Sequence, residues 1–78
     1  MTYNNPIAER IYVLLQPLIG PTMARGSLKV QVEKLGVSEE TLSKKFLPEL
    51  AANIEKGLRV FLGTDKAREV SSNIKNIT

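Results

Sequence analysis

The stretch LPELAANIEKGLRVFL, residues 47–62, has the clearest pattern in the chain. Its apolar side chains recur at steps of three and four residues, which places them along one face of an α-helix. They are Leu47, Leu50, Ala51, Ile54, Leu58, Phe61 and Leu62. Gly63 ends the pattern, and Gly57 inside it is interpreted as the mark of a close helix crossing. We predict a helix that forms the centre of the core. The side chains that we expect to be buried are Leu50, Ile54, Leu58 and Phe61.

Proline and glycine divide the chain before this helix. Asn5 is a favourable N-cap residue, and Pro6 suits the first helical position because its missing N–H would be unpaired there in any case. Apolar residues continue at helical spacing to about Leu18. The pair Gly20-Pro21 then begins a second helix, which we expect to reach about Leu35. That helix has a stripe of mostly small residues where another helix can pack closely: Gly20, Ala24, Ser27 and Gln31.

Two further helices are predicted from their capping residues. Gly36 fits the position after a helix, and Ser38 is a favourable cap for a short third helix. Thr64 caps a fifth helix, which has a narrow apolar stripe. The stripe consists of Ala67, Val70, Ile74 and Ile77. The sequence therefore predicts an all-α fold, a compact bundle of about five short helices that forms a single domain over residues 1–78.

Composition restricts the class of protein. The 78 residues include 11 Lys and Arg against 8 Asp and Glu, a net charge of +3 with both signs interleaved along the chain. This balance permits a nucleic-acid partner but does not indicate one. The longest apolar run is far too short to span a membrane, and the first residues lack the pattern of a secretory signal. We expect a cytoplasmic protein that does not bind membranes.

Catalytic and metal-binding residues are scarce. The chain has no histidine and no cysteine, which removes the commonest general base and the commonest metal ligands. Glu39 and Glu40 are the only adjacent acids, and we interpret them as stabilising the start of the third helix. Neither a P-loop nor a GxGxxG spacing occurs. We therefore expect no enzyme activity, no cofactor, no metal site and no small-molecule substrate.

Residues 28–46, LKVQVEKLGVSEETLSKKF, resemble the helix-turn-helix of bacterial transcription regulators, including the AraC-type proteins. Gly36 in the turn, Val37-Ser38 after it, and the packing positions Leu35 and Leu42 carry this resemblance, which extends over residues 28–47. It implies a second helix that enters the major groove of DNA. The residues implied to contact DNA are Ser38, Ser43, Lys44 and Lys45. The two acids after Ser38 oppose phosphate, so DNA binding is the alternative function.

Apolar residues beyond a single face favour a protein partner. Val60 points away from the predicted core face, and the stripe on the fifth helix is only about one residue wide. Such surfaces commonly mark association sites. The candidate interaction surface consists of Val60, Leu62, Val70, Ile74 and Ile77. We expect a small non-catalytic protein–protein interaction module that forms a homodimer, with a helix-turn-helix DNA-binding regulator as the alternative.

Overall fold

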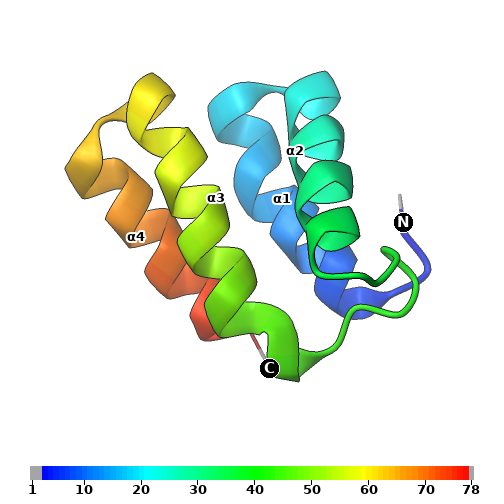
Figure 1. Ribbon diagram of the computed structural model, residues 1–78. Helices are drawn as coiled ribbons and strands as arrows, with labels where there is room; N and C mark the ends of the chain where they lie inside the picture. The colour runs from blue at the N-terminus through cyan, green and yellow to red at the C-terminus, as the bar shows by residue number, and fades with distance from the viewer. Residues whose placement is uncertain (1–2, 78) are drawn as a thin grey trace.

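The computed structural model describes residues 3–77, which form four α-helices and one short 3₁₀ helix (Figure 1). In chain order these are α1 (Pro6–Ile19), α2 (Pro21–Lys34), η1 (Lys44–Phe46), α3 (Leu47–Leu62) and α4 (Thr64–Lys75). The all-α prediction is confirmed. The described residues have four α-helices in place of the five predicted, and none of these helices is long and apolar enough to cross a membrane.

The helix boundaries follow from local residues. Asn5 caps α1, because its side-chain Oδ1 accepts a hydrogen bond from the backbone N–H of Ile7 at 2.9 Å. Gly20 alone connects α1 to α2 with φ +86°, and Gly63 alone connects α3 to α4 with φ +83°. Glycine adopts positive φ without the steric strain of a side chain. The fold therefore consists of two tight helical hairpins, α1–α2 and α3–α4, which pack against each other (Figure 1).

The predicted third helix is wrong. Residues 35–43 form turns and extended backbone, and Glu39 and Glu40 therefore do not lie in the first turn of a helix. The Ser38 hydroxyl accepts from the backbone N–H of Thr41 at 3.3 Å, and the Thr41 hydroxyl accepts from the N–H of Ser38 at 2.9 Å. These two bonds close an isolated turn. Short hydroxyl side chains can bond to nearby backbone groups in place of the helical hydrogen bonds, so the turn does not continue into a helix. Leu42 then enters the core, and η1 leads into α3.

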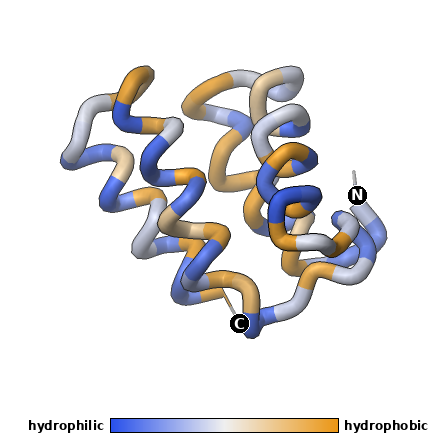
Figure 2. Tube along the Cα trace, viewed as in Figure 1, coloured by the Kyte–Doolittle hydropathy of each residue, from blue (hydrophilic) through white to orange (hydrophobic). Residues whose placement is uncertain are grey.

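The core lies between the two hairpins. Leu50, Ile54 and Leu58 are buried as predicted, whereas the prediction for Phe61 is wrong, since 60 % of its surface is exposed. Phe61 lies in the last turn of α3 and lines a small hollow that Ser27 of α2 also lines. Figure 2 shows α1 as hydrophobic along much of its length, while hydrophobic positions on α4 recur about once per turn. Helix α1 contributes Ala8, Ile11, Tyr12 and Leu15 to the core, and α4 contributes Ala67, Val70, Ser71 and Ile74.

Candidate interaction surface

The structure divides the predicted interaction residues between the core and the surface. Val70, Ile74 and Ile77 are at most 8 % exposed, so the narrow stripe of α4 packs inside the monomer and is not part of a free surface. Leu62 is half-buried against the core. Val60 is 84 % exposed. A narrow apolar stripe such as that of α4 can be buried either against another chain or against the protein's own helices. In this structure the protein's own helices cover it.

Most of the exposed large hydrophobic side chains lie on α2 and α3. Among residues 3–77 the exposed large hydrophobics are Val13, Met23, Val30, Val60 and Phe61. Met23 and Val30 belong to α2, and Val60 and Phe61 belong to α3. Val60 follows Gly57 by three positions and therefore lies on the same side of its helix. Met23, Val30 and Phe61 line hollows on the side of the molecule where α2 and α3 are neighbours.

Two hollows define this side. A small one of about 70 Å³ lies between α2 and α3, and a shallow one of about 440 Å³ lies over α2. The first is lined by Ile19, Ser27, Gln31, Asn53, Ile54, Gly57, Leu58 and Phe61. The second is lined by Thr22, Met23, Gly26, Ser27, Val30 and Gln31. We call these residues the α2–α3 face. None of them is charged, in a chain of which 24 % of residues are charged.

Among residues 3–77, Gly26 and Gly57 have open space beside them, and Gln31 has an unpaired polar atom. A Cβ atom added at Gly26 or Gly57 would meet no atom within 4 Å, so the predicted close helix crossing at Gly57 is wrong. Ser27 and Gln31, from the predicted small stripe, do face α3 across the smaller hollow. The Gln31 Oε1 is buried and has no hydrogen-bond partner within the described residues. An unpaired buried carbonyl destabilises a protein.

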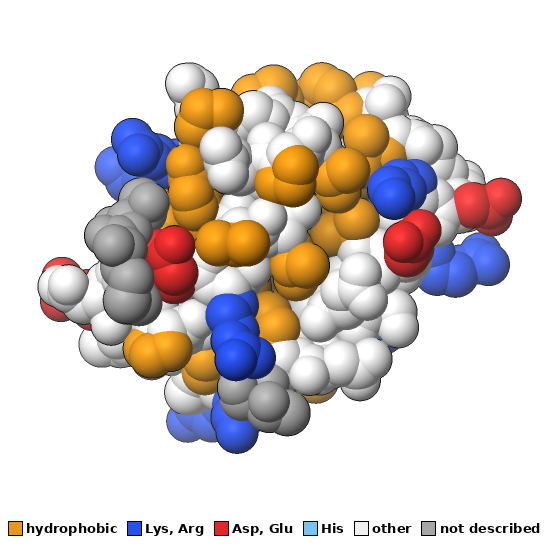
Figure 3. Space-filling view, turned by 180° about the vertical axis from the view of Figure 1, so that it is seen from behind, with side chains coloured by type: hydrophobic (Ala, Val, Ile, Leu, Met, Phe, Trp, Pro, Cys, Tyr) orange, Lys and Arg blue, Asp and Glu red, His pale blue; other side chains and the backbone are white. Residues whose placement is uncertain are grey.

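The opposite side differs in its charge. Hydrophobic side chains also gather there, with Lys or Arg and Asp or Glu side chains around them (Figure 3). A groove of about 410 Å³ runs between α1 and α4 on residues that include Val13, Leu14 and Ile77. Glu9 and Arg10 also line it, so this groove has both charges in its wall. Val13 is its one large exposed hydrophobic and is 54 % exposed.

The residues implied to contact DNA lie in the connection between the hairpins. Ser38 is held in the turn with Thr41, and Ser43 is half-buried in extended backbone. Lys44 and Lys45 are exposed on η1, a helix of three residues. The described segment therefore lacks the second helix that a helix-turn-helix places in the major groove. DNA binding by these residues stays a prediction, and no helix at this position supports it.

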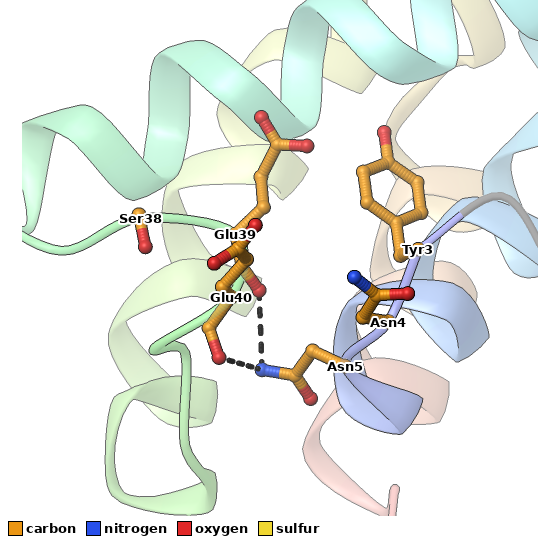
Figure 4. A pocket seen from close by; sticks show the side chains of 6 residues that line it. All are labelled: Tyr3, Asn4, Asn5, Ser38, Glu39 and Glu40. Atoms are coloured by element: carbon orange, nitrogen blue, oxygen red, sulfur yellow. Dashed lines mark hydrogen bonds between the residues drawn. The ribbon is translucent and has the colours of Figure 1, made fainter.

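The same connection is fastened by one side chain (Figure 4). The Asn5 Nδ2 donates to the backbone carbonyls of Glu39, Glu40 and Leu42 at 3.1, 3.2 and 2.7 Å. A polar cavity of about 530 Å³ lies beside these contacts, with Tyr3 and the Glu39 side chain in its wall. Burial raises the pKa of the Tyr3 phenol, and the nearby Glu39 carboxylate raises it further. Asn5 therefore links the start of α1 to the connection that leads into α3.

The acidic side chains of the described residues are the groups available to bind a metal ion or to form ion pairs. No cluster of three or more Asp or Glu side chains among residues 3–77 is placed to hold a metal ion. The pKa of Glu55 is lowered by its hydrogen bond to Arg59, whose guanidinium nitrogen lies 2.8 Å from the Glu55 carboxylate. This pair lies on the surface of α3, with its two residues four positions apart along the helix. Its arrangement is that of a helix-stabilising ion pair.

No family model, no curated protein and no solved structure matches this chain. Its function is therefore inferred from its own residues and their arrangement.

Proposed function

We propose that this protein is a non-catalytic interaction module that associates with a second copy of itself through the α2–α3 face. One observation carries the proposal: three of the five exposed large hydrophobic side chains, Met23, Val30 and Phe61, line the two hollows of this face, and none of the lining residues is charged. Scattered exposed hydrophobics are ordinary on a protein surface. A contiguous uncharged group of them is typical of an association site.

Self-association suits this face better than association with a charged partner. In a two-fold symmetric dimer the same patch contributes to both sides, so a charged side chain near the axis would meet its own copy. The two hollows of the α2–α3 face have no charged residue in their lining, which limits that repulsion; Arg25 and Lys29 line a neighbouring hollow that shares Gly26. The groove between α1 and α4 has both Glu9 and Arg10 and is the less favourable surface for this mode.

Sedimentation velocity at micromolar concentration tests the proposal. We expect the wild-type chain to sediment with a mass near two chains. Phe61→Glu places a charge in the α2–α3 face and should yield a monomer, and Met23→Glu should do the same. Val13→Glu is the matched control, because Val13 is similarly exposed but lies on α1.

Circular dichroism would first establish that each variant keeps the helix content of the wild type. A wild-type chain that stays monomeric at high concentration would contradict self-association. Loss of the dimer in Val13→Glu together with a normal dimer in Phe61→Glu and Met23→Glu would place the interface on the groove between α1 and α4.

A further inference from the structure

The hollow over α2 has an internal symmetry. Its lining residues are Thr22, Met23, Gly26, Ser27, Val30 and Gln31. These six positions are arranged evenly about the midpoint between residues 26 and 27, so that 22 corresponds to 31, 23 to 30, and 26 to 27. Each corresponding pair matches in chemistry: a hydroxyl with a carboxamide, two exposed hydrophobics, and two small residues. A helix surface with this property is complementary to an antiparallel copy of itself.

We propose that the occupant of this hollow is α2 of a second copy, packed antiparallel across a two-fold axis that passes between Gly26 and Ser27. The proposal rests on the self-association proposed above and specifies its geometry. Met23 then lies opposite Val30 of the second copy, and Gly26 lies opposite Ser27 of the second copy. Every contact occurs twice, as two-fold symmetry requires.

Gly26 supports this crossing point. Glycine inside a helix is destabilising relative to alanine, and no atom of the described residues lies within 4 Å of the place where its Cβ would be. Packing within the monomer therefore does not require glycine at this position. Two helix backbones that cross at Gly26 and Ser27 approach closely because neither residue has a large side chain. The second copy supplies the neighbour that the monomer lacks.

Polar groups agree with the same pairing. Gln31 is held with its Oε1 buried and unpartnered within residues 3–77. In the antiparallel arrangement Thr22 of the second copy lies opposite Gln31. A turn of the flexible Gln31 side chain toward the second copy brings its carboxamide to that hydroxyl. The dimer then satisfies a polar atom that has no partner in the monomer.

Cysteine cross-linking tests the pairing, and the chain is suited to it because it has no cysteine of its own. Met23→Cys and Val30→Cys are prepared separately, mixed and oxidised. We expect a mixed disulfide dimer, identified by its mass, because these two positions face each other. In the same pairing identical positions are seven residues apart along the helix, about 10 Å. That separation exceeds the Cα–Cα distance of a disulfide, so each variant oxidised alone should stay uncross-linked.

Val13→Cys is the control for random collision and should give no cross-link with either variant, while sedimentation of the wild type reports association independently. A wild-type dimer without the mixed disulfide overturns the antiparallel pairing and leaves self-association standing. Efficient cross-linking of each variant with itself shows parallel pairing and likewise overturns the proposal. A wild-type chain that is monomeric in sedimentation overturns both the pairing and the proposed function.

Discussion

Gly26 contributes flexibility to an interior position of α2 without any steric need in the monomer. We expect Gly26→Ala to raise the free energy of unfolding of the monomer by about 0.5–1 kcal/mol, because alanine restricts the unfolded chain and favours the helix. Urea denaturation at a concentration below self-association measures the change. Gly63→Ala is the contrast: its φ of +83° strains any side chain, so the same substitution there should lower stability.

Glu55 gives the stability a defined pH dependence. Its hydrogen bond to Arg59 lowers the pKa of the carboxyl in the folded state below 4.5, so the stabilisation is fully present above the unfolded pKa. It is lost as the pH falls through the folded pKa, where Glu55 becomes protonated. We expect Glu55→Gln to lower the melting temperature slightly at pH 7, because the pair is partly exposed. In strong acid the two chains should melt alike, and an equal difference at both pH values would contradict the ion pair.

At the scale of elements, Asn5 connects α1 to the segment before α3. Asn5→Ala removes the cap on α1 and the three contacts to Glu39, Glu40 and Leu42, and we expect it to lower stability by more than the ~1 kcal/mol typical of a lost cap. Asn5→Asp is the matched variant, since it keeps the cap acceptor but replaces the donor by a carboxylate facing carbonyl oxygens. Chemical denaturation should show Asn5→Asp as destabilised too. A wild-type stability in Asn5→Asp would mean that these contacts contribute nothing.

Helix α3 has both buried and exposed hydrophobic side chains. Ile54→Ala should lower the free energy of unfolding by about 2–5 kcal/mol, because Ile54 is only 3 % exposed. Phe61→Ala should change the stability of the monomer far less, by about 0.5 kcal/mol, since most of its side chain is in water. Urea denaturation of the monomeric chains compares them. Equal losses in the two variants would contradict the assignment of Phe61 to the surface.

Elements governed by neighbouring residues were predictable from the sequence. The proline at the start of α1 and the glycines at positions 20 and 63 act on their own backbone, and the boundaries they predict match the structure. The connection at residues 35–43 was not predictable in this way. Its conformation depends on the Ser38–Thr41 turn and on Asn5, which reaches Leu42 across 37 positions of sequence. Local caps indicate where a helix is favourable, and such contacts decide whether it forms.

The candidate site was predictable only in part, for a reason of geometry. Val60 stands outside the apolar face of α3, so its exposure followed from the helical spacing. The stripe on α4 was misplaced because its sequence does not say which helix covers it. Met23 and Val30 were missed, although a signal was present: both lie off the buried side of α2, which is formed by Ala24, Leu28 and Val32. Apolar residues outside a helix's buried face are the better indicator of an interface.

In the whole molecule, the two hairpins enclose a common core and leave an uncharged face on α2 and α3. The chain has no disulfide and is short, so its monomer buries a smaller share of its surface than a larger domain does. Pairing of two such faces enlarges the buried apolar area without a change of fold. On this account the stability of the protein increases with its own concentration, as mass action requires for a dimer.

The most direct test of the account is a dilution series of backbone amide NMR spectra, which reports association and its location together. We expect concentration-dependent shifts at residues 22–31 of α2 and 53–61 of α3, with small changes along the groove between α1 and α4. Spectra that do not change with concentration, in a chain that stays monomeric throughout, would contradict self-association. Shifts confined to Arg10, Val13 and Asn73 would place the interface on the opposite side and contradict its assignment to the α2–α3 face.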